Sequence, residues 1–225
     1  MRIRRKDGQE TARRILISAA DVFANKDYHG STVSEICQLA GVNVAAVNYH
    51  FGDKETLYAE AWRYAFSESL KAFPPDGGIP TDASPEKRFE GQISSFLRRI
   101  ADENNKEFWI TQQELASPTG LLREVMRADI APLIKSVEEV VRGILGPYVA
   151  EPQVHFSVAS IMSQCSGPMA VRKHYMAVGE HDRGLEHFRN IDGYIKHVVQ
   201  FSLGGLNTTR KAAENRRPVN PKQEL

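Results

Sequence analysis

Hydrophobic residues recur every three or four positions along most of this 225-residue chain, and this spacing is typical of amphipathic helices. The first stripe runs through Ile15, Ala19 and Phe23 and predicts a helix over residues 9–25. No segment shows the alternation of β-branched and polar residues that predicts a strand. The pattern therefore indicates an all-α fold.

Two short helices are predicted next, joined by a glycine. Thr32 and Glu35 have the spacing of a capping box, in which the hydroxyl and the carboxylate bond to free backbone N–H groups at the start of a helix. Gly41 tolerates the left-handed conformation that ends a helix, and Asn43 can cap the helix that follows. Such a pair predicts a helix-turn-helix. Its inward-facing residues are expected to be Ile36, Leu39, Ala40, Val42 and Val47.

A long helix is predicted after Asp53. It ends at a clear boundary, because residues 74–85 hold four prolines and two glycines. Pro132 and Pro168 are expected to kink or split the later helices that contain them, since proline removes a helical hydrogen bond. These later helices are predicted at 84–102, 106–116, 119–146, 152–176 and 191–206. The chain thus divides into a three-helix bundle at 1–52, a second helical domain at 53–206 with a loop at 74–85, and a flexible tail at 207–225.

The whole chain is almost neutral, with 29 Lys and Arg against 28 Asp and Glu. This balance and a hydrophobic content of 41% exclude a disordered chain, and neutrality at first argues against a nucleic-acid-binding protein. The basic charge is concentrated, however, because residues 1–14 carry six basic and two acidic side chains. This N-terminal arm is either a solvated end or an arm that reaches DNA beside a helix-turn-helix.

Cysteine use and polarity bear on where the protein works. Cys37 and Cys165 lie far apart in the sequence, so they indicate neither a disulfide framework nor a metal site. The basic N-terminus is not followed by an apolar segment, so no secretory signal is expected. The longest stretch without charged residues, 152–171, is only half apolar, which is too polar for a membrane span. We expect a cytoplasmic protein without a membrane segment, in which other helices bury this stretch.

The second helix of a helix-turn-helix enters the major groove of DNA and presents side chains to base edges. Its outward residues are expected to be Asn43, Val44, Ala45, Asn48, Tyr49 and His50. Because none is Lys, Arg, Asp or Glu, they would read bases through amide hydrogen bonds and contacts with thymine methyl groups. Asn48 has no capping duty and is the stronger candidate for a bidentate contact with adenine. Asn43 either caps its helix or contacts a base.

Residues 9–60 resemble the N-terminal region of the TetR family of bacterial one-component transcription regulators. The resemblance rests on the motifs Ser31-Thr32-Val33, Ala40-Gly41-Val42 and Tyr49-His50-Phe51-Gly52-Asp53-Lys54. The family often has a phosphate-contacting tyrosine where this chain has Asn48, so we expect Tyr49 to take that role. The later motif Trp109-Ile-Thr-Gln-Gln-Glu-Leu-Ala-Ser-Pro is similar to that of the CecR-type subgroup.

The resemblance implies a DNA-binding transcriptional regulator rather than an enzyme, with no cofactor and no bound metal. It implies a repressor that binds double-stranded DNA at a palindromic operator, as a homodimer formed by the last two helices. Residues 1–52 would bind DNA, and residues 53–206 would dimerise and bind an unidentified small-molecule effector. The expected DNA contacts are Thr32, Asn43, Val44, Ala45, Asn48, Tyr49, His50 and Lys54. Tyr49, His50 and Lys54 would hold phosphates, but Tyr49 and His50 have the alternative of sealing the three-helix core.

The family resemblance also implies an effector cavity among the C-terminal helices. Aromatic and methionine walls with a few polar groups suit a mostly apolar pocket. The expected lining residues are Phe96, Trp109, Gln112, Met126, Phe156 and Met162. For each of them the alternative is ordinary core packing.

A different function, a small all-α metal-binding protein or enzyme, would use the histidine-containing region at 174–187. Its candidate ligands are His174, Glu180, His181, Asp182 and His187. They lack the compact His-x3-His spacing of a helical metal site, and nearby glycines indicate a loop. A surface loop is the preferred interpretation of this region.

Overall fold

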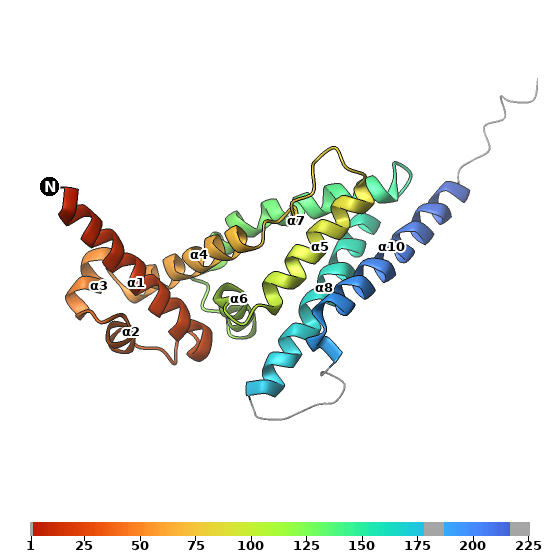
Figure 1. The fold of residues 1–225 in the computed structure, drawn as a ribbon. Coiled ribbons are helices and arrows are strands. Elements are labelled where there is room, and N and C mark those ends of the chain that lie inside the picture. The colour runs from red at the N-terminus through yellow and green to blue at the C-terminus, as the bar shows by residue number, and fades with distance from the viewer. Residues whose placement is uncertain (1, 178–186, 217–225) are drawn as a thin grey trace, which may run out of the picture. The chain divides into compact units, whose positions relative to one another are not determined.

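A computed structural model gives the backbone of residues 2–177 and 187–216, and side chains at 7–172, 175 and 187–216. Every α-helix predicted from the periodicity is present, and those ranges contain no strand (Figure 1). The helices are α1 (Arg2–Lys26), α2 (Val33–Ala40), α3 (Val44–Phe51), α4 (Lys54–Ala72), α5 (Pro85–Ala101), α6 (Lys106–Ala116), α7 (Arg123–Leu145), α8 (Glu151–Ala177) and α10 (Ile191–Asn215), with a 3-10 turn, η1 (His187–Arg189), before α10. The all-α prediction is confirmed.

The helices gather into two compact units. The first, called the head unit below, holds α1 to α4, α6 and the residues between Arg99 and Ala131. The second holds α5 up to Arg98, α7 from Pro132 onward, α8 and α10. The chain thus passes from one unit to the other inside α7, at a proline whose missing N–H weakens the helix. Both α7 and α8 nevertheless run through their prolines as single helices, so the expected splitting is wrong.

Aromatic side chains form the core of the head unit. Phe23 of α1 packs edge-on against Tyr58 of α4, with ring centroids 4.8 Å apart. Trp62 stacks on Phe66 one turn further along α4, at 4.9 Å. Phe23 and Trp62 are completely buried and Tyr58 is 1% exposed, so each contributes about 1.5–3 kcal/mol of hydrophobic stabilisation. This core fixes α1 against α4.

Polar groups hold α6 in the same unit. The Glu107 carboxylate accepts a hydrogen bond of 2.6 Å from the Arg99 guanidinium, and both side chains are more than 90% buried. Burial raises the pKa of Glu107, although the positive charge of Arg99 opposes the shift. Glu114 lies about two turns further along α6 and accepts a hydrogen bond of 3.3 Å from the Tyr58 hydroxyl. Two buried carboxylates of α6 therefore depend on partners within the head unit.

Two further hydrogen bonds join α6 directly to α1 and α4. The indole N–H of Trp62 donates to the Thr111 hydroxyl at 2.9 Å. The Gln113 amide donates to the carbonyl oxygen of Ala24, near the end of α1, at 3.0 Å. The helix that follows α5 is thus bonded to the helices that carry the helix-turn-helix.

In the second unit, α8 and α10 lie side by side (Figure 1). The Tyr194 hydroxyl of α10 donates to the carbonyl oxygen of Gln164 in α8. The helix expected to end at residue 206 continues to Asn215, so that part of the predicted tail is wrong. Residues 207–215 contain neither proline nor glycine, and nothing in them stops a helix that packing has already started.

Breaking the buried ion pair tests how much α6 contributes to the head unit. Arg99→Met should lower the free energy of unfolding by about 3–5 kcal/mol, because the buried Glu107 carboxylate loses its partner. Urea denaturation followed by circular dichroism measures the change.

The neighbouring residue supplies the control. Arg98 pairs with Asp192 at 2.5 Å on an exposed surface, so Arg98→Met should cost at most about 1 kcal/mol. Equal losses for the two variants would show that the buried pair has no special role.

Candidate DNA-binding interface

The ends of α2 are fixed by the residues that the sequence indicated. The Thr32 hydroxyl accepts a hydrogen bond of 3.2 Å from the N–H of Glu35. The Glu35 carboxylate pairs with Lys26 of α1 at 2.6 Å, so it joins two helices where a reciprocal cap was expected. Gly41 closes the helix at φ 64°, a left-handed conformation that glycine adopts without strain. The start and stop of α2 are confirmed.

Caps also define the helix after the turn and the start of α4. The Asn43 side chain accepts a hydrogen bond of 2.9 Å from the N–H of Ala46. The Asp53 carboxylate accepts one of 2.7 Å from the N–H of Thr56, and this bond lowers the pKa of Asp53. The capping role of Asn43 is confirmed, and a contact of its amide with a base stays a prediction.

The helix-turn-helix packs through small and branched side chains. Ile36 is fully buried, Val47 is 1% exposed and Ala40 is 6% exposed, as predicted. Leu39, however, is 59% exposed, so its inward placement was wrong. It lies one residue, or about 100°, around α2 from Ala40, and only the face carrying Ile36, Cys37 and Ala40 is covered.

One face of α3 is open to solvent and almost uncharged. Tyr49 is 84% exposed and Val44 is 47% exposed, and Ala45 and Asn48 are also exposed. The alternative in which Tyr49 seals the core is therefore wrong. His50 is half-buried and its ring lies 5.0 Å from that of Tyr49, so it supports the exposed ring from the side.

Lys54 lies at the start of α4, but its ammonium group bonds to backbone carbonyl groups of the same chain. It donates hydrogen bonds to the carbonyl oxygens of Tyr28 at 2.6 Å and Ser31 at 2.7 Å. The same group lies 4.3 Å from the centre of the Tyr28 ring, which is the geometry of a cation–π contact. Desolvation lowers the pKa of Lys54, although the carboxylate of Asp27 opposes the shift. Lys54 thus braces the turn between α1 and α2, a role that the sequence did not indicate.

The N-terminal arm is continuous with α1, which begins at Arg2. A Cβ atom placed on Gly8 would lie 3.9 Å from Cε1 of His50. The chain that follows the basic residues therefore passes the end of α3. The side chains of residues 2–6 lie outside the described ones, and contact of this arm with DNA stays a prediction.

The expected effector residues divide between the two units. Trp109, Gln112 and Met126 belong to the head unit, whereas Phe96, Phe156 and Met162 belong to the second. Phe156 is 63% exposed, so its placement in a cavity wall was wrong for the single chain. The other five are half-buried, and a common cavity for them stays a prediction.

The metal-site alternative falls mostly on residues outside the described part of the chain. These are the side chain of His174 and the residues Glu180, His181 and Asp182. Among the side chains that are described, no group of three or more His, Cys, Asp or Glu residues is arranged to hold a metal ion. No helix within 2–177 or 187–216 is both long and apolar enough to cross a membrane.

Replacing Lys54 should have different effects if it only supports the turn between α1 and α2 than if it contacts a DNA phosphate. Lys54→Met should destabilise the protein by about 1.5–3 kcal/mol, because two charge-assisted hydrogen bonds are lost. It should weaken DNA binding without changing the slope of log K against log salt concentration, since no phosphate contact is removed. Fluorescence anisotropy over a range of salt concentrations gives the slope.

Lys71→Met is a matched control at the other end of α4, where Lys71 is exposed and pairs with Glu68. It should leave both stability and slope nearly unchanged. A slope reduced by about one unit in Lys54→Met alone would instead show a direct phosphate contact.

Comparisons with known proteins agree with this geometry. Residues 15–61 match the family described as bacterial regulatory proteins, tetR family. Residues 85–206 match the family described as HTH-type transcriptional dual regulator CecR, C-terminal domain. The second match alone covers more than half of the chain.

Curated relatives are regulators as well. The chain is 33% identical over 96 residues to the HTH-type transcriptional regulator AcrR of Shigella flexneri, covering 43% of this chain and 40% of that protein. It is 26% identical over 131 residues to the fatty acid metabolism regulator protein of Bacillus subtilis (strain 168), covering 58% of this chain and 64% of the relative. The matches thus span less than two thirds of either relative.

Solved structures share the fold. A putative fatty acid metabolism regulator from Clostridium perfringens superposes with a TM-score of 0.66 at 18% identity, covering 85% of this chain and 97% of that one. A transcriptional regulator from Rhodococcus sp. Rha1 superposes with a TM-score of 0.64 at 19% identity, covering 88% and 96%. With a capped helix-turn-helix at one end and a matching C-terminal domain at the other, the chain belongs to the TetR family of bacterial regulatory proteins and carries a CecR-type C-terminal domain.

Proposed function

We propose that this protein is a homodimeric transcriptional repressor that binds a palindromic DNA operator and is released by a small-molecule effector. The observation that carries the proposal is the solvent-exposed, nearly uncharged face of α3. Its side chains have no packing duty, and both ends of the helix are fixed by caps. A rigid helix with a free face is what readout in the major groove requires.

The residues on this face suit base contacts. Asn48 offers an amide that can donate to N7 and accept from N6–H of adenine, and Val44 and Ala45 offer methyl groups to thymine. The hydroxyl of Tyr49 and the ring of His50 lie next to them and would contact phosphate, together with Thr32 at the start of α2. Phosphate contacts would then set the register, and Asn48 would contribute most of the specificity.

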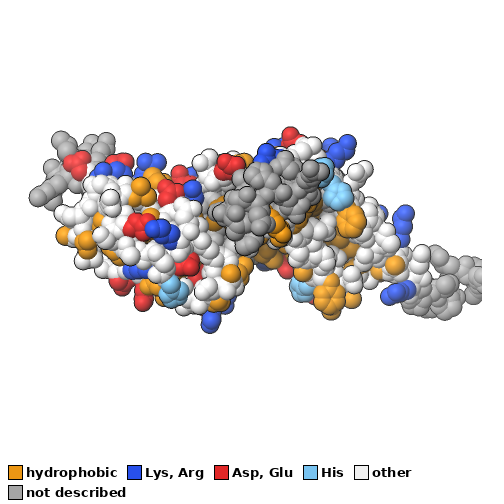
Figure 2. Space-filling model, turned by 90° about the horizontal axis from the view of Figure 1, so that it is seen from below, with side chains coloured by type: hydrophobic (Ala, Val, Ile, Leu, Met, Phe, Trp, Pro, Cys, Tyr) orange, Lys and Arg blue, Asp and Glu red, His pale blue; other side chains and the backbone are white. Residues whose placement is uncertain are grey.

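The second unit supports dimerisation through α8 and α10. The inner faces of the two helices are buried, but Phe156 on α8 and Phe201 on α10 are each 63% exposed. Gly204 and Gly205 on α10 have no heavy atom within 4 Å of an added Cβ, so a second helix can approach closely there. Figure 2 shows hydrophobic side chains beside histidines on one face of the molecule. A second copy of both helices would cover these groups as a four-helix interface.

For an effector to release the DNA, its binding must be able to shift α2 and α3 through the contacts of other helices. The helix α4 is suited to this role, because it runs from Lys54 beside the helix-turn-helix to Ala72. The helix α6 adds a second connection through its bonds to Trp62 and Ala24. An effector that favours a different position of α6 would shift the population towards a state that does not fit the operator.

The DNA-binding proposal is tested by selecting bound fragments from a genomic library and then changing Asn48. The expected result is a recovered sequence with two-fold symmetry. Asn48→Ala should cost about 1–3 kcal/mol on that sequence and relax the preference at one base position of each half-site. Anisotropy titrations with single-base variants of the sequence give both numbers.

Gln38→Ala serves as the control, because Gln38 is exposed on α2 and outside the expected contacts. It should keep the preference at that base position. If Asn48→Ala also kept it, Asn48 would belong to the scaffold rather than to the readout.

The dimer proposal predicts the effect of a charge on the open face. Phe201→Glu should turn the dimer into a monomer, because the carboxylate would be buried without a partner. Sedimentation velocity measures the change in mass. Leu115→Glu makes the same kind of replacement at a residue of α6 that is 65% exposed, and it should leave the dimer intact. A monomeric wild-type protein at micromolar concentration would contradict the proposal.

A further inference from the structure

The exposed face of α3 carries no Lys or Arg, so the positive charge for binding DNA phosphates must come from elsewhere. Proteins neutralise backbone phosphates with Lys and Arg side chains. Residues 7–56, which contain α2, α3 and most of α1, hold four such side chains with described positions: Arg13, Arg14, Lys26 and Lys54. The contacts of these four show which of them can bind a phosphate.

Three of the four are engaged within the chain. Nζ of Lys26 pairs with Glu35 at 2.6 Å, and the ammonium group of Lys54 donates to two backbone carbonyl oxygens. Nη1 of Arg13 lies 3.8 Å from a carboxylate one helical turn away on α1. Arg14 is exposed and makes neither an ion pair nor a side-chain hydrogen bond within the described part of the chain. Its guanidinium group therefore keeps its N–H donors for a ligand.

The guanidinium group of Arg14 lies beside the turn of the helix-turn-helix. A Cβ atom placed on Gly41, which ends α2, would be 3.9 Å from Nη1 of Arg14. In such a motif the first helix crosses the DNA backbone, and the N-terminal residues of the second contact base edges in the major groove. Gly41 and the cap residue Asn43 lie between these two helices. We therefore expect Arg14 to face the phosphates that border the groove.

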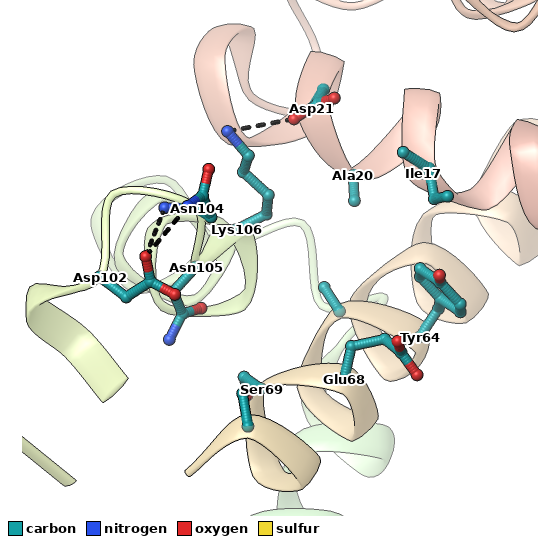
Figure 3. Close-up of a pocket in the computed structure, with 12 residues that line it drawn as sticks. Ile17, Ala20, Asp21, Tyr64, Glu68, Ser69, Asp102, Asn104, Asn105 and Lys106 are labelled. Atoms are coloured by element: carbon teal, nitrogen blue, oxygen red, sulfur yellow. Dashed lines mark hydrogen bonds and ion pairs between the residues drawn. The ribbon is translucent and has the colours of Figure 1, made fainter. Parts of the chain in front are cut away.

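Contacts along α1 fix the position of Arg14. Six residues earlier, or about 9 Å along the helix, a Cβ atom placed on Gly8 would be 3.9 Å from Cε1 of His50. This half of α1 thus runs beside α3 from its last turn to the turn before it. Further along, Asp21 pairs with Lys106 at 3.1 Å, next to the pocket that α1 shares with α4 and the start of α6 (Figure 3). A side chain held on a fixed helix loses less freedom when it binds.

We propose that Arg14 contacts a DNA phosphate at the edge of the major groove that α3 enters, and that it supplies positive charge which α3 lacks. The planar guanidinium group can donate two parallel hydrogen bonds to one phosphate. The contact differs from an N-terminal arm that reaches a minor groove, because Arg14 lies at the turn itself. The inference rests on the proposed reading of DNA by α3.

The salt dependence of DNA binding tests this contact. Anisotropy titrations use the sequence recovered by genomic selection and a mixed-sequence duplex of equal length, because phosphate contacts do not depend on sequence. Each contact contributes about 0.9 to the slope of log K against log salt concentration. For each copy of the chain on the DNA, Arg14→Gln should reduce the slope by about 0.9 and weaken binding about eightfold at 0.1 M salt. Arg14→Lys keeps the charge and should keep the slope.

Arg127→Gln removes an equal charge elsewhere in the head unit. Arg127 lies on α7, outside the helix-turn-helix, and pairs with Glu124 at 2.8 Å. Its replacement should leave the slope and the affinity unchanged. Equal reductions in Arg14→Gln and Arg127→Gln would show a general attraction by charge and would overturn the proposal. An unchanged slope in Arg14→Gln would overturn it as well.

Neutral phosphate analogues locate the contact. A methylphosphonate removes the charge of a single phosphate, and it is placed at each position of the recovered sequence in turn. At one position in each half-site, this change should weaken binding of the wild-type protein but not of Arg14→Gln. If the variant were as sensitive as the wild-type protein at every position, the proposal would be wrong.

These results can be separated from the outcome for the proposed function. Because Arg14 is exposed and has no partner to lose in the described part of the chain, Arg14→Gln should stay folded, which circular dichroism checks. If selection recovers no symmetric sequence, the operator proposal fails, and the slope on the mixed-sequence duplex still tests Arg14. If a symmetric sequence is recovered and Asn48→Ala relaxes its readout, an unchanged slope in Arg14→Gln would overturn the Arg14 contact alone.

Discussion

Two carboxylates on α6, Glu107 and Glu114, are buried against the helices that position the helix-turn-helix. They lie seven residues apart, close to two helical turns, and therefore face the same side. A buried carboxylate is tolerated only while its partners stay in place. The Glu107 carboxylate accepts from Arg99, Asn105 and Ser69. The Glu114 carboxylate accepts from the hydroxyl of Tyr58 and, over shorter distances, from Thr119 and Gly120 just after α6. Ser69 and Tyr58 are the partners that α4 contributes, so a displacement of α6 along α4 breaks one hydrogen bond of each carboxylate.

The positions of α2 and α3 depend on this arrangement of α6. Tyr58 touches both Glu114 and the ring of Tyr28, whose centroid is 5.1 Å away. The ammonium group of Lys54 lies over the ring of Tyr28 and donates a hydrogen bond to the carbonyl oxygen of the same residue. A continuous set of contacts therefore leads from α6 through α4 to the turn before α2. Such a set is a physical route by which a change at α6 can reach the DNA-binding face, provided that both states are populated.

Local features of the fold followed directly from the sequence. Caps at Thr32, Asn43 and Gly41 involve residues within four positions of one another, so the spacing of residue types was enough to predict them. The orientation of Leu39 was not predictable in this way, because its exposure depends on which face of α2 other helices cover. The extension of α10 also depended on packing that had started earlier in the helix.

The missed parts of the candidate site are contacts between distant residues. Lys54 bonds to carbonyl groups 26 and 23 residues away, and no periodicity reports such a contact. The pocket of the head unit brings together α1, α4 and the start of α6, which the sequence had divided between two domains. Its lining residues are individually ordinary, and only the fold places three carboxylates around one space.

We propose that two copies of α3 read a two-fold symmetric site from one face of the DNA. Hydroxyl-radical footprinting of the bound fragment tests it most directly, because it maps protection at single-nucleotide resolution on both strands. We expect two symmetric protected segments with centres one helical turn, about 34–36 Å, or a multiple of it, apart. A single protected segment without symmetry would contradict it.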